Sequence, residues 1–448
     1  MTQSPESLAH DLLRAATRAG ADAADAMAVA GTSTSIRVLN GGLEHAERSE
    51  GTEIGLRVIL GQRQACVSAS DTKPETLHEM AERAVAMARE APDDPTIGLA
   101  DPAQLAQGWD IAALDMCDPG TEPDPATLEA AALEAEAAAL AVHGITQVQS
   151  ASAGYGRRTR HLAATNGFSG GYTRTDHGLS CVAITGEGLT MERDYYGDMR
   201  IHRADMEPAE TVGRIAAERT IARAGARQPE TGACPVLFDE RIAGSLIQHI
   251  LQAVNGAAIA RGASWLRDAL GEQVLPRGLD LIEEPLRPRA SGSRPFDAEG
   301  LPTRTRAIVK EGMLTGWTLD LATARKLGLQ STGNAARGLS SPPAPSVSNI
   351  ALTQGSASRD ELMAGMGRGL LITSLIGSSI NPNTGDYSRG ASGFWVEDGQ
   401  IAYPVNECTV AGNLRDMLGG IVPANDARTH LSHICPSLLV EGMTLAGA

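Results

Sequence analysis

The same helix entry occurs twice in the N-terminal half, and this repetition limits the folds open to the chain. Residues 4–8 (SPESL) and 124–128 (DPATL) each place a capping side chain before a proline in the first helical turn. Alternating apolar segments follow each entry, and a further helix then begins, at Pro74 in the first copy and at Pro208 in the second. We therefore expect two copies of one helix–sheet–helix unit.

Short strands are expected between these helices. In the first copy they are Thr34–Leu39, Gly55–Leu60 and Gln64–Val67, and in the second copy Thr146–Ala151, His161–Ala164, Ser169–Thr175 and Leu179–Thr185. Asn40-Gly41 predicts a turn after the first of these strands. The second copy is longer than the first, which predicts an insertion near Glu187 to Arg203.

A change of composition at Gly225 to Gly232 begins a third region. Pro235 to Phe238 predicts a buried strand, and Asp239 caps an apolar helix that runs to about Ile259 and should be nearly surrounded by protein. Further along we expect a hairpin of Thr305–Val309 with Leu314–Leu319, an irregular loop at 332–345, a helix at Arg359–Met366 and a strand at Leu370–Leu375.

These patterns predict an α+β fold class. A duplicated helix–sheet–helix N-terminal region is followed by a mainly β C-terminal domain with a buried helix. The expected domains are the N-terminal unit at 1–90, a linker rich in Asp and Pro at 91–123, the second unit at 124–228 and the C-terminal domain at 229–448.

Residues 378–404 combine glycines, polar residues and two adjacent aromatic side chains. Phe394-Trp395-Val396 predicts a strand, Glu397-Asp398-Gly399 a tight turn, and Gln400 to Tyr403 the returning strand. The hairpin is either plain scaffold or the wall of a groove that takes another polypeptide as an added strand. Arg389 either binds a carboxylate of a ligand or pairs with Asp386 or Glu397 to fix the loop.

Composition and charge exclude several classes of partner. The formal net charge of −16 argues against binding to nucleic-acid phosphates and to an anionic membrane surface. The start of the chain shows no signal peptide, and no apolar run is long enough to span a membrane. The six cysteines are widely spread without a CxxC pair, which is typical of reduced thiols. We expect a soluble cytoplasmic protein.

Few residues suggest chemistry of their own. No phosphate-binding loop, dinucleotide-binding motif, kinase motif or nucleophile elbow is present. His430 and His433 lie near Cys435 in sequence, which suits either a metal cluster or, as we prefer, loop histidines beside a buried cysteine. His249 falls within the apolar helix, where a lone histidine is more often a hydrogen-bonded core residue than a ligand.

Several segments of the C-terminal half together resemble the PmbA/TldE branch of the TldD/PmbA family. They are residues 235–259, 295–300 (PFDAEG), 309–317 (VKEGMLTGW), 324–329 (ARKLGL), 384–399 (TGDYSRGASGFWVEDG), 403–405 (YPV) and 411–417 (AGNLRDM). The resemblance implies a cytoplasmic heterodimeric metalloprotease in which a TldD-type partner carries the zinc. It also implies an association with peptide maturation, with degradation of unfolded peptides, and with an older label of DNA gyrase modulation.

The resemblance also implies where a zinc motif would lie. In TldD-type members, the helix after the Pro-Val-Leu strand carries His-Glu-x-x-x-His, and a late cysteine completes the metal site. When this chain is aligned with that pattern on Pro235 and Gly244, Gln248 takes the place of the first histidine, His249 that of the glutamate, and Ala253 that of the second histidine. Gln binds zinc poorly and Ala not at all, and His249 is one residue out of phase with the ligands.

Cys435 is the candidate for the late cysteine, but a single thiolate does not hold a catalytic zinc. We therefore expect no catalytic residue and no cofactor in this chain, with zinc in the partner subunit.

The resemblance makes a non-catalytic subunit of a two-chain peptidase the preferred function. Its expected partners are a TldD-type subunit and an unfolded peptide, and the homodimer of the isolated chain stays open. Candidates for peptide binding or for lining a shared chamber are Asp386, Tyr387, Arg389, Phe394 and Trp395. The alternatives are a regulatory or binding protein without a protease role, and a self-sufficient homodimeric peptidase.

Overall fold

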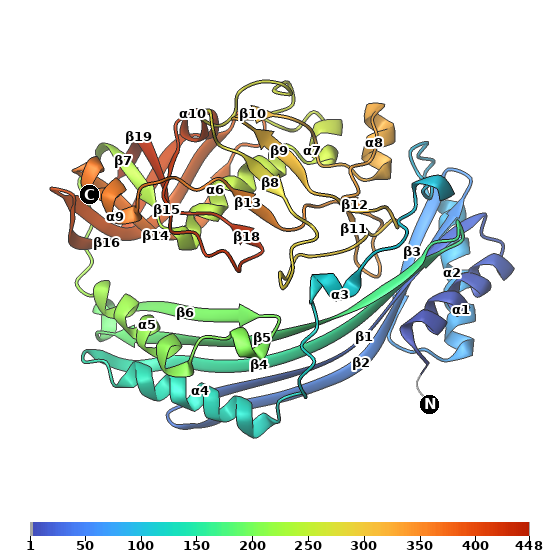
Figure 1. The fold of residues 1–448 in the computed structure, drawn as a ribbon, viewed down its shortest axis with the longest axis horizontal. Coiled ribbons are helices and arrows are strands. Elements are labelled where there is room, and N and C mark those ends of the chain that lie inside the picture. The colour runs from blue at the N-terminus through green and yellow to red at the C-terminus, as the bar shows by residue number, and fades with distance from the viewer. Residues whose placement is uncertain (1–2, 448) are drawn as a thin grey trace.

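The computed structural model describes residues 3–447 as two layers. A curved sheet built from the N-terminal half lies below the C-terminal domain, and the two layers approach each other more closely at one end than at the other (Figure 1). Within residues 3–447, every helix is too short or too polar to cross a lipid bilayer.

The first unit follows the expected order of elements. They are α1 (Pro5–Arg18), β1 (Ala23–Leu39), β2 (Gly42–Leu60), β3 (Arg63–Ala69) and α2 (Pro74–Glu90). The Ser4 hydroxyl accepts a hydrogen bond from the Ser7 N–H and caps α1. Asn40 and Gly41 both have positive φ, as a tight hairpin turn requires. The apolar faces of both helices pack on one face of the strands.

The second unit repeats this order. Its elements are α4 (Pro125–Leu140), β4 (Ile145–Ala164), β5 (Ser169–Thr185), β6 (Glu192–Arg200) and α5 (Ala209–Ala222). The two units form a single antiparallel sheet in the order β3-β2-β1-β4-β5-β6. The long strands β1 and β4 pair at its centre, from Asp25 to Val38. The expected duplicated helix–sheet–helix region is therefore confirmed.

Two details expected in the second unit are wrong. Residues 146–164 form one strand rather than two, because the polar residues between them face a half-exposed surface and still pair with β1. Ser169 to Thr185 is likewise one strand. Glu187 to Arg203 is not an insertion as a whole, since it holds β6, which pairs with β5 as β3 pairs with β2. The extra length lies mainly in the turns on either side of β6, at 186–191 and 201–208.

The segment between the units lies against both layers. It contains η1 (Pro102–Gln104) and α3 (Ile111–Leu114). Trp109 packs on Phe168 of the sheet and on Phe296 of the C-terminal domain, with ring centroids 5.8 and 4.9 Å away. Arg325 of the C-terminal domain donates to the carbonyl of Thr96 at 2.9 Å. The boundaries of the four expected domains stay a prediction.

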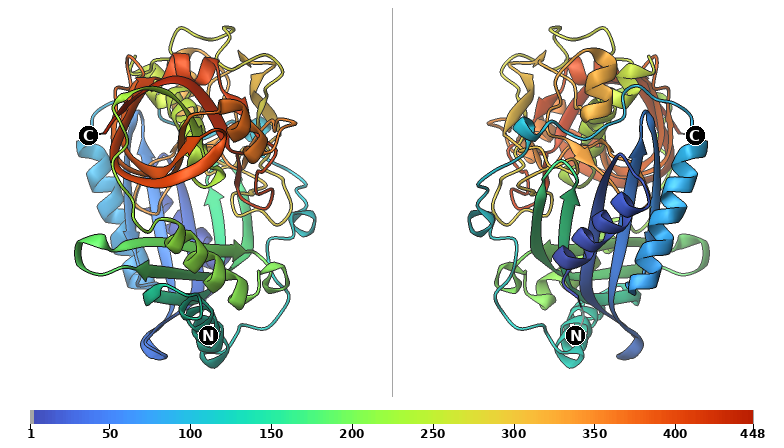
Figure 2. Two further views of the ribbon diagram at one scale, coloured as in Figure 1. Left: turned by 90° about the vertical axis from the view of Figure 1, so that its left-hand side faces the viewer. Right: turned by 90° about the vertical axis from the view of Figure 1, so that its right-hand side faces the viewer.

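The C-terminal domain is built around a closed ring of strands. Its members are β7 (Gly232–Phe238), β14 (Gly369–Ile380), β15 (Asp386–Glu397), β16 (Gln400–Asn413) and β19 (Leu438–Ala446), with β17 (Val422–Pro423) beside β19. Pairing of β16 with β19 closes the ring, which Figure 2 shows end-on. The expected hairpin turn is confirmed at Asp398 and Gly399, both with positive φ, but its strands are longer than predicted.

The buried helix is α6 (Glu240–Ala253), and the side chain of Asp239 caps it as predicted. Its apolar face lies in the largest core of the molecule. The helix ends earlier than predicted, because Asn255 caps a separate short helix, α7 (Gly256–Ala260). A polar cap inside an apolar run therefore divides the predicted helix.

A second sheet and several short elements complete the domain. The sheet contains β10 (Met313–Leu314), β9 (Arg306–Lys310), β8 (Leu281–Glu283), β13 (Ile350–Leu352) and β18 (His433–Ile434). The short elements are α8 (Leu321–Leu327), α9 (Arg359–Met366), α10 (Leu414–Gly419), β11 (Ala335–Ala336), β12 (Ala344–Pro345), η2 (Gly188–Thr190) and η3 (Arg203–Asp205). The expected strand at Leu314–Leu319 is wrong beyond Leu314, since the chain turns there toward the cap of α8 at Asp320.

A buried polar contact, here called the joint, fixes the C-terminal domain on the sheet. Arg337, from the loop between β11 and β12, pairs with Asp25 on β1, which also pairs with Arg57 on β2 at 2.5 Å. Gly55 makes room for this loop, because a Cβ atom there would lie 2.2 Å from the carbonyl oxygen of Leu339. The aromatic cluster around Trp109 lies at the same end of the molecule, because Leu339 of this loop packs against it.

Candidate functional site

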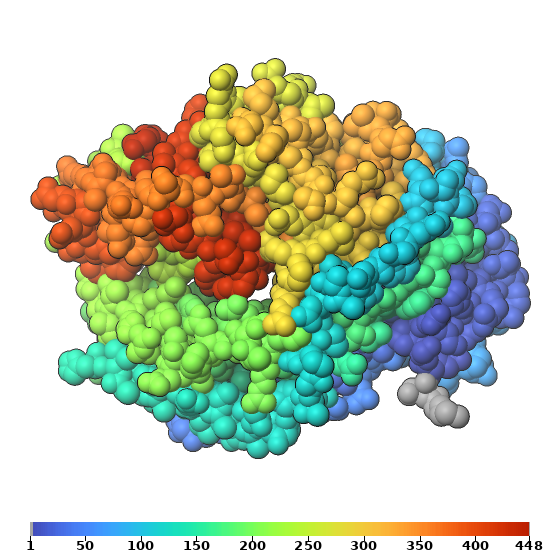
Figure 3. All heavy atoms as spheres, in the orientation of Figure 1, coloured from blue at the N-terminus to red at the C-terminus, as the bar shows by residue number. Residues whose placement is uncertain are grey.

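At the opposite end, the sheet and the C-terminal domain enclose a cavity of about 1210 Å³. Its walls are β5 and β6 of the second unit, the first turns of α6, strands β14 and β15, and the loop at 428–435. In the space-filling view a recess lies between the green second unit and the orange and red C-terminal residues (Figure 3). The cavity therefore lies between parts of the chain that are far apart in sequence.

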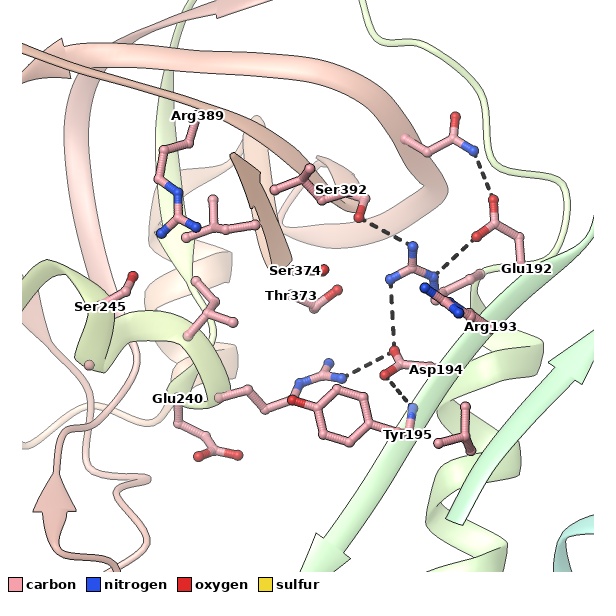
Figure 4. Close-up of a pocket in the computed structure, with 18 of the residues that line it drawn as sticks. Glu192, Arg193, Asp194, Tyr195, Glu240, Ser245, Thr373, Ser374, Arg389 and Ser392 are labelled. Atoms are coloured by element: carbon pink, nitrogen blue, oxygen red, sulfur yellow. Dashed lines mark hydrogen bonds and ion pairs between the residues drawn. The ribbon is translucent and has the colours of Figure 1, made fainter. Parts of the chain in front are cut away.

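Ion pairs join the walls of the cavity (Figure 4). Asp194 on β6 lies 3.3 Å from the Arg241 guanidinium on α6 and 3.9 Å from that of Arg223 beyond α5. Arg223 also pairs with Glu192 at 3.3 Å and donates to the Ser392 hydroxyl on β15 at 3.2 Å. The second unit is thus connected to the start of α6 and to the strand ring.

The start of α6 carries two carboxylates with opposite pKa shifts. Burial acts to raise the pKa of Asp239, but the charge of Arg241, 2.9 Å away, and its hydrogen bonds hold that pKa below its ordinary value. Burial raises the pKa of Glu240, and Arg428 at 2.7 Å opposes this shift. Asp239 therefore stays ionised at the helix N-terminus, where a negative charge is favourable.

The cavity wall has unused hydrogen-bond donors. Arg389 donates through Nε to the carbonyl of Gly377 at 2.7 Å, and Arg193 donates to Gln149 at 3.3 Å. Within the described chain, neither guanidinium has a carboxylate partner. The buried hydroxyls of Ser245 and Thr373 also lack a partner among residues 3–447.

Arginines outnumber acidic residues in the wall of this cavity. The wall contains Arg193, Arg223, Arg241, Arg389 and Arg428, against Glu192, Asp194 and Glu240. The whole chain has the opposite balance. The lining therefore suits carbonyl oxygens or an anionic group better than a cation.

The structure separates the five side chains expected to bind peptide. Arg389 lies in the cavity wall. Tyr387 is buried in the core, with its ring 5.8 Å from that of His249. Phe394 and Trp395 are also buried, in different apolar clusters. Asp386 is exposed and accepts hydrogen bonds from Thr384 and Asn413.

Arg389 pairs with neither Asp386 nor Glu397 among the described residues. The expected peptide-binding role of all five residues stays a prediction.

The residues at the zinc-motif positions do not fit a zinc site. Gln248 and Ala253 offer no good ligand, and the ring of His249 packs edge-on against Tyr387. Cys435 lines the cavity, but burial raises the pKa of its thiol, which donates to the carbonyl of Pro436. A single thiol does not hold a catalytic zinc.

Other histidines and acids do not complete a metal site near Cys435. His430 lies 3.7 Å from the carboxylate of Asp198 on β6. In the part of the chain that the structure describes, ligating atoms of three such side chains lie within 4.8 Å of one another only at Glu6, His10 and His161. That cluster involves α1, at the other end of the sheet.

The sequence patterns do not predict the ion-pair wall of the cavity. Two of its acidic residues, Glu192 and Asp194, lie two apart in the segment expected to be an insertion. The alternation Glu-x-Asp followed by aromatic residues is a strand signal that could have revealed β6. Nothing local to the sequence shows that Arg223 and Arg241 meet there.

Comparisons with known proteins agree with this fold. Three family profiles match in order: PmbA/TldA metallopeptidase domain 1 over residues 24–88, the central domain over 118–224, and the C-terminal domain over 231–447. The metalloprotease PmbA of Escherichia coli O157:H7 is 36% identical over 417 residues, covering 93% of this chain and 90% of that protein. A metalloprotease PmbA homolog of Haemophilus influenzae is 34% identical and covers 96% and 94%.

Solved structures show the same architecture. A putative modulator of DNA gyrase from Bacteroides thetaiotaomicron superposes with a TM-score of 0.92 at 26% identity and covers all of both chains. TldE from Thermococcus kodakarensis gives a TM-score of 0.84 at 20% identity, covering 98% of this chain and 100% of that one, a likeness of fold alone. The resemblance seen in the sequence is confirmed: the chain belongs to the PmbA/TldD metallopeptidase family.

Proposed function

We propose that this chain is the non-catalytic subunit of a cytoplasmic two-chain metallopeptidase that acts on unfolded peptides. One observation carries the proposal: Gln248, His249 and Ala253 stand where the zinc motif of the family would lie, and their side chains do not fit a metal site. The zinc would be held by a TldD-type partner. Membership of a metallopeptidase family supports the peptidase role.

The cavity is the part of this chain best suited to hold an extended peptide. Strand β6 is an edge of the six-stranded sheet and lines the cavity, but side chains of α5 already bond the main chain of Asp194 and Tyr195. A peptide main chain would therefore pair with the part of this edge that α5 leaves open. The unpaired donors of Arg389, Thr373 and Ser245 would bind carbonyl oxygens or a carboxylate of that peptide. This chain would bind and orient substrate, while the partner cleaves it.

Peptide cleavage tests the division of labour. The chain alone, its TldD-type paralogue from the same genome alone, and the mixture are each incubated with an unstructured peptide and zinc. We expect no cleavage by this chain alone and cleavage by the mixture. Cleavage by the isolated chain would overturn the proposal and favour a self-sufficient peptidase. A mixture that binds peptide without cleaving it would also overturn it and favour a binding protein.

Substitution of Arg389 tests the role of the cavity. In the mixed pair, Arg389→Ala should raise the KM for peptide about tenfold, the loss expected for a charge-assisted hydrogen bond of roughly 1.5 kcal/mol. Arg389→Lys should reverse part of this increase in KM. Asp386→Ala is the matched control, because Asp386 belongs to the same hairpin but lies outside the cavity wall. Unchanged turnover by Arg389→Ala would return the hairpin to a scaffold role.

A further inference from the structure

Helix α1 places two possible metal ligands over the second unit's strands. Glu6 and His10 lie four residues apart on α1, so they share one face of the helix. His161 lies on β4, on which α1 packs. One ligating atom from each of these three side chains lies within 4.8 Å of the other two.

The two imidazoles converge on a single hydroxyl. Nε2 of His10 lies 3.1 Å and Nε2 of His161 lies 2.9 Å from the Oγ atom of Ser169 on β5. One hydroxyl can donate to one of these nitrogens and accept from the other. Both nitrogens therefore face the same small volume, beside the Glu6 carboxylate.

Gly171 supports the position of His161. The two residues are opposite each other in the β4–β5 ladder. A Cβ atom at Gly171 would lie 2.7 Å from Nδ1 of His161, so the ring rests where another residue would have a side chain. The Nδ1 side of the His161 ring lies over the backbone of Gly171, and Nε2 points to the hydroxyl of Ser169.

The side-chain types of this cluster suit a transition-metal ion. Two imidazoles and one carboxylate are a ligand set that zinc takes, with one further position for water or another oxygen.

The repeated unit lacks these side chains. Counted from the proline that opens each helix, Glu6 and His10 of α1 are replaced by Ala126 and Ala130 in α4. The cluster is therefore not a requirement of the helix–sheet packing that both units share.

We propose that Glu6, His10 and His161 form a binding site for a divalent transition-metal ion such as Zn²⁺, with Ser169 as the adjacent oxygen. The bound ion would connect α1 of the first unit with β4 of the second, across the centre of the sheet. The site is remote from the cavity and independent of the proposed peptidase role.

Calorimetric titration of the full, untagged, chelator-treated chain with Zn²⁺ tests this site, and Co²⁺ absorption reports the geometry. We expect one strong equivalent and a four-coordinate Co²⁺ spectrum. His10→Ala and His161→Ala should each weaken binding at least tenfold, since even loss of an outer-shell partner costs about 10–100-fold. Ser169→Ala should keep the binding, because all three ligands remain.

Controls separate this site from the cavity and from misfolding. Cys435→Ser should leave Zn²⁺ binding unchanged, whereas loss of binding in that variant would overturn the proposal and place the ion in the cavity. His10→Gln, which keeps a polar contact with Ser169, should fold as the parent does by circular dichroism and still lose binding. Unchanged binding in His10→Gln and His161→Ala would overturn the site. Peptide cleavage by the mixed pair tests the proposed function separately.

Discussion

Both ends of the molecule contain ion pairs between arginines and carboxylates, but the paired side chains are more exposed to solvent at the cavity than at the joint. At the joint, the side chains of Arg337 and Asp25 are 0% and 4% exposed. At the cavity, those of Arg223 and Glu192 are 14% and 13% exposed, beside a large open volume. Both sets connect the N-terminal sheet to the C-terminal domain.

This difference in exposure separates the joint, which fixes the C-terminal domain on the sheet, from the ion pairs that line the cavity. Burial lowers the pKa of Arg337 to about 10, so the guanidinium stays charged at neutral pH and Asp25 compensates this buried charge. In the cavity wall Arg223 and Arg241 each pair with two carboxylates, so neither guanidinium depends on a single acid. We therefore expect loss of the carboxylate at the joint to be strongly destabilising, whereas Arg223 and Arg241 in the cavity wall each keep one ion pair if Asp194 is lost.

Replacing the central acid at each end should give the largest contrast. Asp25→Ala leaves two buried arginines without their carboxylate and should lower the free energy of unfolding by about 3–5 kcal/mol. Asp194→Ala leaves Arg241 with Asp239 and Arg223 with Glu192, so we expect a loss of about 1–2 kcal/mol. Urea unfolding of both variants measures the two losses. Equal losses of unfolding free energy in the two variants would contradict the expectation that the joint depends more on its central acid than the cavity wall does.

The aromatic contact of the connecting segment should matter less than Asp25. Trp109→Ala removes a half-buried ring from between Phe168 and Phe296 and should lower the free energy of unfolding by about 2 kcal/mol. Trp109→Phe should recover much of the loss. If Trp109→Ala unfolds at the parent's urea midpoint, the segment does not help to hold the layers together.

A pH dependence of stability is also expected at the joint end. Burial, together with the neighbouring charge of Asp297, raises the pKa of Glu299 to about 8. The folded state then binds more protons than the unfolded state between the ordinary pKa of 4.5 and about 8. Stability should therefore fall as the pH rises through this window.

Glu299→Gln tests this dependence without removing the acceptor for the Leu321 N–H. The variant should flatten the decline in thermal midpoint between about pH 6 and pH 8, the upper part of this window. At the cavity end Asp239 has the opposite shift, so its contribution is present at neutral pH and is lost only as the pH falls through its depressed pKa. A slope unchanged in Glu299→Gln would assign the pH dependence to another group.

Local signals predicted the helices well and the strands incompletely. Proline entries and caps fix where α1, α2 and α4 begin, because these depend on neighbours in sequence. Strands β2 and β4 extend through polar stretches, because ladder pairing with a distant strand replaces the apolar alternation that a single sequence shows.

The candidate site was harder to predict than the fold. The motif positions Gln248, His249 and Ala253 could be found from the sequence because they follow a recognisable strand and cap. Arg223, Arg241 and Asp194 come from three separate elements, and only the packing of the second unit under α6 brings them together. Arg389 is the one predicted peptide contact that lies in the resulting cavity wall.

The ladder between β1 and β4 has a consequence for how the chain can be divided. An edge strand attracts other chains, and each unit taken alone would expose a long edge, from Asp25 to Val38 in the first unit. In the intact chain each unit covers the other's edge, and β3 and β6 remain as the outer strands. Proteolytic nicking within residues 91–123 would leave this ladder whole, so the fragments should stay assembled, whereas a single unit expressed alone should self-associate.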